Sequence, residues 1–94
     1  MDSTWKLSHR HSLMQRTWGD EAAVYDPLSG STHLVDIVAV SVLDHLNASD
    51  ASAAAIAEPL LTEFGAESKE DVLAAVRAAL ASLRDIGLVR PTEE

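Results

Sequence analysis

Residues 13–35 read LMQRTWGDEAAVYDPLSGSTHLV, and this stretch decides the fold. Two turn signals, Gly19-Asp20 and Ser29-Gly30, divide it into three short segments. The second segment ends before Pro27, because proline cannot donate a hydrogen bond to a strand ladder. In the third segment, residues 32–35 alternate between two faces, as strand geometry requires. We therefore expect an antiparallel meander of three strands.

The spacing of apolar residues predicts two helices directly after the meander. Asp36 can cap the first, which runs through Leu46, although the alternating valines of this segment also fit a strand. The second is short and follows a cap at Asp50 or Ser52. Pro59 lies outside its apolar stripe and is expected on the solvent side, and Gly65 closes the helix.

The clearest helix begins at the capping-box sequence Ser68-Lys69-Glu70-Asp71 and ends at Gly87. Residues 88–90 then predict a brief terminal strand. The order of elements is that of an α+β domain over residues 13–90. We expect residues 1–12 to be a flexible N-terminal segment and residues 91–94 to be a frayed tail.

Size and charge exclude several classes of function. A chain of 94 residues fits one domain with a modest core. Its net charge of −8 argues against nucleic acid as a partner, because that affinity rests on Lys and Arg. The chain has no cysteine, which excludes disulfides and thiolate zinc sites and makes the cytoplasm the expected location. No apolar run approaches the roughly 20 residues that a membrane span needs.

The sequence lacks the constellations that catalysis or metal binding requires. His9 and His11 are close together, but no carboxylate or cysteine accompanies them, so we interpret them as part of a surface loop. His33 is better explained by a hydrogen bond to the preceding turn that fixes the third strand. The acidic residues near position 70 are explained by capping of the third helix. We therefore expect no enzymatic activity, no metal and no cofactor.

A stripe of small residues on the third helix allows two interpretations. Ala74, Ala78 and Ala81 lie side by side on the helix, with Arg77 and Arg84 at the margin of the stripe. Small side chains let another backbone approach closely, which favours a contact surface. Alanine also has the best helix propensity, so the same residues fit simple filling of exposed positions. The sequence leaves both interpretations open.

Four segments together resemble the PqqD family: YDPLSGSTHL at residues 25–34, the valine-rich helix after Asp36, Asp71-Val72, and LRDIGLV at residues 83–89. Within that family, residues 29–34 look most like the PqqD-like proteins of the HPr-rel-A system. That gene cassette also carries a kinase-like protein related to HPr kinase. The resemblance implies a winged-helix-like domain, also called the RiPP recognition element. It favours helix over strand after Asp36.

The resemblance also implies a binding mode. In that fold a leader peptide adds as an extra strand to the third strand and lies against the third helix. Our hypothesis is therefore a peptide-binding chaperone or adaptor that presents a peptide to a modifying enzyme, with Arg77 and Arg84 attracting acidic side chains of the peptide. The helix candidates come from periodicity, not from a family motif. The predicted peptide-binding residues are Thr32, His33, Leu34, Val35, Ala74, Arg77, Ala78, Ala81 and Arg84.

Two other functions remain as alternatives. The chain would act as a protein-binding subunit if its partner were the kinase-like protein itself. A winged-helix regulator would place the third helix in the major groove of DNA, but the acidic charge argues against it. The segment through residue 12 is a candidate for packing over the groove, or for exchange between the two subunits of a homodimer.

Overall fold

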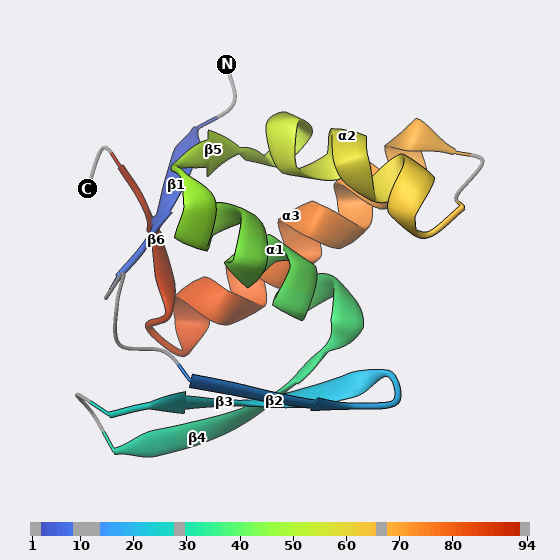
Figure 1. Cartoon of the computed structure of the whole chain (residues 1–94). Coiled ribbons are helices and arrows are strands. Elements are labelled where there is room, and N and C mark those ends of the chain that lie inside the picture. Colours follow the sequence, from blue (N-terminus) through green and yellow to red (C-terminus); the bar gives the residue numbers. More distant parts are fainter. Residues whose placement is uncertain (1–2, 9–13, 28–29, 66–67, 93–94) are drawn as a thin grey trace.

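The computed structural model describes residues 3–8, 14–27, 30–65 and 68–92. The three helices lie on one side of a three-stranded sheet, with α2 farthest from it, and a second small sheet flanks the helices (Figure 1). This confirms the predicted α+β class. In chain order the elements are β1 (Thr4–Leu7), β2 (Met14–Trp18), β3 (Glu21–Asp26), β4 (Ser31–Asp36), α1 (Ile37–Ala48), β5 (Ala51–Ser52), α2 (Ala53–Glu63), α3 (Lys69–Asp85) and β6 (Val89–Pro91).

The predicted meander is confirmed as the antiparallel sheet β2-β3-β4. Its two faces differ sharply, as the alternation of side chains requires. Ala22 and Val24 of β3 are fully buried toward the helices, whereas Tyr25 points to the outer face. β3 is the central strand, so β2 and β4 are the edges of this sheet.

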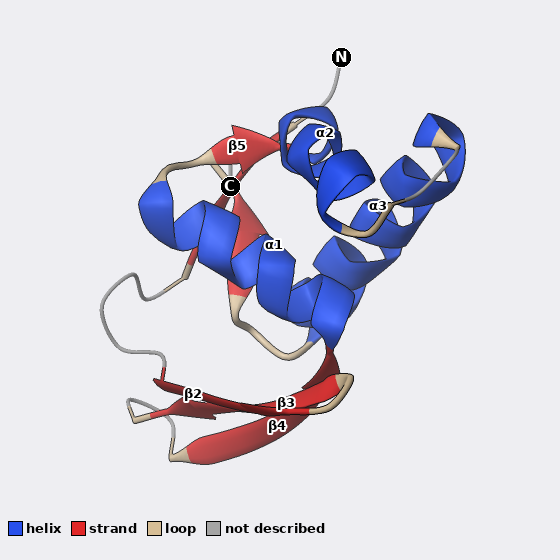
Figure 2. Ribbon diagram, turned by 45° about the vertical axis from the view of Figure 1, so that its right-hand side comes forward, coloured by secondary structure: helices blue, strands red, loops and turns tan. Residues whose placement is uncertain are grey.

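The segment after Asp36, whose sequence fits both a helix and a strand, is a helix. Residues 37–48 are helical, and the Asp36 carboxylate accepts a hydrogen bond from the Ala39 amide at 2.8 Å. In α2 the cap is Ser52, and Pro59 lies inside the helix on its exposed side, as expected. Figure 2 shows the three helices stacked over the inner face of the sheet.

The end of α3 confirms the glycine prediction in detail. Gly87 adopts a left-handed φ of 81°, a conformation that glycine adopts without the steric cost of a Cβ atom. The Gly87 amide donates to the Arg84 carbonyl at 3.0 Å, and the Leu88 amide donates to the Leu83 carbonyl at 2.9 Å. These two bonds form a Schellman motif, which turns the chain directly into β6.

A second sheet, β5-β1-β6, joins the two ends of the chain to a short strand between α1 and α2. Strand β6 confirms the terminal strand predicted at residues 88–90, whereas β1 and β5 were not predicted. Residues 4–7 were expected to be flexible, yet Leu7 is only 5% exposed and joins the core. Residues 91 and 92 are likewise tied down, since the Thr92 amide donates to the Thr4 carbonyl at 2.8 Å. Both corrections have the same cause: β1 finds its partners only in segments far along the chain. His9 and His11 lie outside the described residues.

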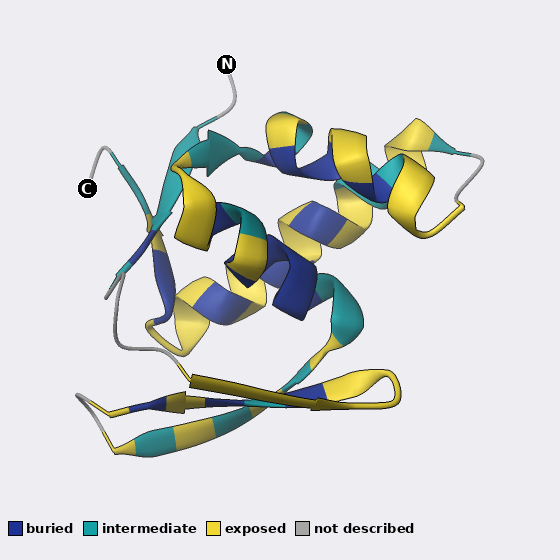
Figure 3. Ribbon diagram, in the orientation of Figure 1, coloured by how far each residue is buried: buried dark blue, intermediate teal, exposed yellow. Residues whose placement is uncertain are grey.

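The core lies between the helices and the two sheets (Figure 3). It is mainly aliphatic, as the composition indicated, and α3 contributes Val76, Leu80 and Leu83, which are at most 1% exposed. In the described part of the chain, no helix is long and apolar enough to cross a membrane.

The small sheet gives a first test. We expect Leu7→Ala to lower the free energy of unfolding by about 3 kcal/mol, because the substitution leaves a cavity against the core. Met14→Ala is the matched control: Met14 is 63% exposed on β2, so a change within about 0.5 kcal/mol is expected. Urea denaturation followed by circular dichroism measures both. Equal effects of the two substitutions would contradict the packing of β1.

Candidate functional site

An open groove of about 470 Å³ runs between β4 and α3. The start of α1 closes it at one side. Helix α3 supplies one wall, and the other wall comes from the last half of β4. The lining residues are Leu34, Val35, Asp36, Val38, Ala39, Ala75, Ala78, Ala79, Ser82, Leu83 and Ile86.

The strand wall of the groove is a sheet edge. Within the described residues β4 pairs with β3 alone, so alternate N–H and C=O groups on its other side have no ladder partner. The edge spans Ser31–Asp36, two residues longer than predicted. Leu34 is 70% exposed at its middle, which is unusual for a large apolar side chain.

The helix wall is made of small residues. Ala75, Ala78 and Ser82 are exposed on α3 and leave the surface of the helix low enough for another backbone to approach. Ile86, 38% exposed, stands at the C-terminal end of this wall. The groove thus combines a hydrogen-bonding edge with a shallow apolar wall.

A smaller hollow of about 220 Å³ adjoins the groove at the end of α2. Val38 and Ala75 line both spaces, so the two form one continuous surface. Its remaining lining is mostly apolar and includes Leu60 and Phe64, the latter 42% exposed. The size and lining of this hollow suit one large apolar side chain.

The groove carries little charge. Asp36 is the one ionisable side chain among the residues that line it, and this carboxylate already caps α1. The adjoining hollow adds Asp71, near the start of α3. Neither space is lined by a described Lys, Arg or His. Across residues 3–8, 14–27, 30–65 and 68–92 there is also no cluster of three or more His, Asp or Glu side chains arranged to hold a metal.

The four peptide-binding residues predicted on the strand do not all line the groove. Leu34 and Val35 line the groove. Thr32 is exposed, and the register aligns it with Tyr25 on the outer face. His33 is half-buried on the inner face opposite Val24.

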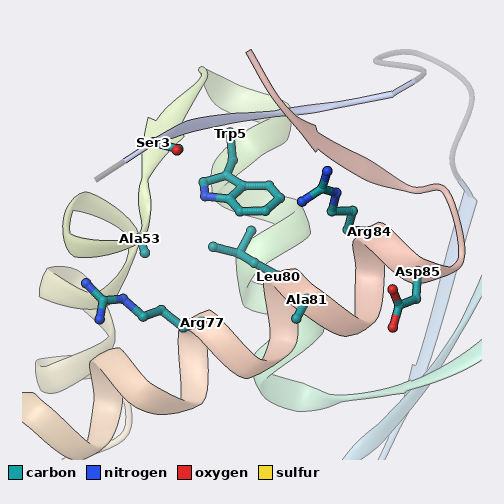
Figure 4. Close-up of a pocket in the computed structure, with 8 residues that line it drawn as sticks. All are labelled: Ser3, Trp5, Ala53, Arg77, Leu80, Ala81, Arg84 and Asp85. Atoms are coloured by element: carbon teal, nitrogen blue, oxygen red, sulfur yellow. The ribbon is translucent and has the colours of Figure 1, made fainter. Parts of the chain in front are cut away.

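The five peptide-binding residues predicted on the third helix also lie in different places. Ala78 lies in the groove, opposite β4. Arg77, Ala81 and Arg84 instead line a separate hollow beside Trp5 (Figure 4). Ala74 is exposed and lines neither space. The structure therefore brings only Ala78 of the five helix candidates against the strand.

Sequence reasoning missed most of the helix wall. Ala75, Ala79, Ser82 and Ile86 follow the spacing i, i+4, i+7 and i+11, which marks one helix face. The alanine stripe chosen from the sequence lies one position away, and each position rotates the face by about 100°. Counting back in helical steps from Ile86, the C-cap residue of α3, would have found the face that lines the groove.

Comparison with known proteins gives one family and one fold. The family model described as coenzyme PQQ synthesis protein D (PqqD) matches residues 21–89. Among solved structures, the chain is similar to TbiB1 in complex with the TbiA(beta) leader peptide, with a TM-score of 0.69 and 18% sequence identity. The likeness covers 90% of this chain and 94% of TbiB1. At that identity it establishes the fold alone. No curated protein matches the chain.

The junction between β4 and α1, which lies at one side of the groove, gives a second test. We expect Asp36→Ala to cost about 1 kcal/mol of unfolding free energy, because the Ala39 amide loses its acceptor. Asp36→Asn keeps an oxygen that can cap and is expected to stay within about 0.5 kcal/mol of the original protein. Chemical denaturation measures both variants. A loss of the same size for Asn and Ala would show that charge, not the capping bond, matters here.

Proposed function

The chain belongs to the PqqD family, and from this membership we propose that it binds a peptide and presents it to a modifying enzyme. The observation that supports this proposal most directly is the groove between β4 and α3, where the edge of the sheet faces a wall of small residues. The fold it shares with TbiB1, whose structure includes a leader peptide, supports the proposal. The role is that of an adaptor, and no chemical step is assigned to it.

The peptide binds by strand addition to β4. Six residues of β4 offer an edge of roughly 20 Å at about 3.3 Å per residue. Each hydrogen bond to the edge contributes about 1 kcal/mol net, so the main chain gives affinity with little dependence on the peptide sequence. Along an added strand, side chains alternate between the α3 wall and the outer side of the sheet.

Selectivity comes from the apolar surfaces. A peptide side chain that points toward α3 meets Ala75 and Ala78, and a longer one reaches the hollow formed by Val38 and Phe64. Burying one Leu or Phe side chain there contributes about 2 kcal/mol. We therefore propose a peptide with a large apolar residue at the position that meets the hollow.

Electrostatics plays a small part in this peptide site. Arg77 and Arg84 lie outside the lining of the groove, so the sequence-based idea that they attract the peptide is not part of this proposal. An uncharged wall predicts that affinity changes little with salt over about 0.05–0.5 M. The specific link to the HPr-rel-A system, the kinase-like partner, the homodimer and the cytoplasmic location stay predictions.

Filling the groove tests the proposal directly. We expect Ala78→Trp to weaken peptide binding at least about tenfold, because the indole occupies the space against β4. Ala74→Trp adds the same ring to an exposed position of α3 that lines neither hollow, and its affinity should stay within about twofold. The ligands are synthetic peptides that tile the short reading frames beside the gene, and the readout is an amide NMR titration.

The same titration identifies the binding mode. Shifts confined to β4 and the groove face of α3, and lost in Ala78→Trp, support peptide capture. Equal binding by both tryptophan variants would refute the groove as the site. Broad loss of signal with a neighbouring kinase-like protein, without any peptide response, would make the chain a subunit of that protein instead.

Strand addition makes a further, sharper prediction. Successive amides of an added strand point alternately toward β4 and away from it. N-methylation of a peptide amide that faces β4 should weaken binding by about tenfold, whereas methylation of the next amide should change it little. A methylation scan measured by fluorescence anisotropy reads this pattern. A scan without the period of two would exclude strand addition, even if the peptide binds.

A further inference from the structure

A second hollow lies on another face of α3. It has a volume of about 430 Å³, and β1 brings Trp5 to it from the other end of the chain. Leu80 and Ala81 also line the hollow, together with Arg77 and Arg84 (Figure 4). Its composition differs from that of the peptide groove, because a large aromatic ring and two cationic side chains meet in one place.

The two arginines lie differently relative to the ring. In Figure 4 the Arg84 side chain extends toward the Trp5 indole, whereas the Arg77 side chain extends away from it, on the side of Ala53. They are seven residues apart, roughly 10.5 Å along the helix. Asp85 lines the same hollow, so the charges of these three side chains sum to +1 (two minus one).

This charge stands out against the rest of the molecule. The chain carries 7 Lys and Arg against 15 Asp and Glu, and two of those cations line this one hollow. A guanidinium has five N–H donors, so each arginine can bind a carboxylate in addition to its contacts within the chain. Paired donors in a planar fork match a carboxylate with two hydrogen bonds.

We propose that this hollow binds an acidic helical segment of the modifying enzyme, with one carboxylate on Arg77, one on Arg84 and an apolar side chain against Trp5. This inference rests on the proposed function, in which the chain must hold an enzyme as well as a peptide. Two carboxylates seven residues apart on a helix lie roughly 10.5 Å apart along its axis, which is also the axial separation of the backbone positions of Arg77 and Arg84. An acidic segment is repelled by most of this chain, so charge directs it to this hollow.

The location makes the proposal consistent with peptide capture. Ala78 lines the peptide groove, whereas its neighbour Arg77 lines the second hollow, so the two sites lie on different faces of one helix. Their lining residues do not overlap. A peptide on β4 and an acidic segment beside Trp5 can therefore occupy the protein at the same time.

The test uses Trp5 as its own reporter. The chain has two tryptophans, and Trp18 is 48% exposed on β2, away from this hollow. In a Trp18→Phe background, emission therefore comes from Trp5. The probe is a synthetic helical peptide of Ala and Leu with two Glu residues seven positions apart, roughly 10.5 Å along its axis. The control probe has Lys in place of Glu.

We expect the acidic probe to change Trp5 emission and the Lys probe to leave it unchanged. Arg77→Gln with Arg84→Gln should weaken the acidic probe at least about fivefold. The matched control is Arg16→Gln with Lys69→Gln, which removes the same charge from exposed positions outside the hollow and should bind almost as well as the parent. A similar loss in both double variants would show a general charge effect and overturn the site.

The groove peptide is titrated into the same samples. Retained groove binding shows that the arginine variants are folded, so a lost response to the acidic probe is then specific. If the acidic probe never changes Trp5 emission while Ala78→Trp still blocks the groove peptide, the second site is wrong and the proposed function stands. If the groove peptide itself fails to bind, the failure belongs to the proposed function.

Discussion

The hydrogen bond from the Ala39 amide to the Asp36 carboxylate, 2.8 Å long, is the constraint on which the groove depends. Asp36 is both the last residue of β4 and the cap of α1, so one side chain fixes the angle at which the strand leaves and the helix begins. Val38 and Ala39 follow at once and join the groove lining. The distance from the strand edge to α3 is therefore set by how α1 packs on α3, not by a flexible loop.

Helix α3 has three faces, and each contributes to a different part of the molecule. Val76, Leu80 and Leu83 are buried in the core. The face that includes Ala78 forms a wall of the groove, and the face that includes Arg77 forms the second hollow. A helix anchored by its core face holds the other two faces rigidly. Their small or long side chains then decide what each face can bind.

The features that could be predicted from the sequence are those with local causes. The caps at Asp36 and Ser68 and the left-handed glycine at position 87 depend on neighbours a few residues away, and all three were found. The strand β1 was missed because its partners, β5 and β6, are far along the chain. Trp5-Lys6-Leu7 does alternate apolar and charged residues, which was the available signal. The wall of the groove was placed one face away, because exposed alanines are alike in sequence and only packing distinguishes their faces.

The missed strand also explains why the second hollow had no counterpart in the sequence analysis. Arg77 and Arg84 were noticed, but the ring that lines the same hollow belongs to Trp5, which is held near α3 because Leu7 is buried and β1 pairs with β6. Without β1 these arginines would belong to an exposed helix face, and the simplest assignment would be attraction of the peptide. With β1 in place, the same two arginines line a separate hollow together with Trp5. The long-range packing of one short strand thus places the arginines outside the proposed peptide site and on the surface proposed for the enzyme, and the proposed peptide site then relies on backbone hydrogen bonds and apolar contact.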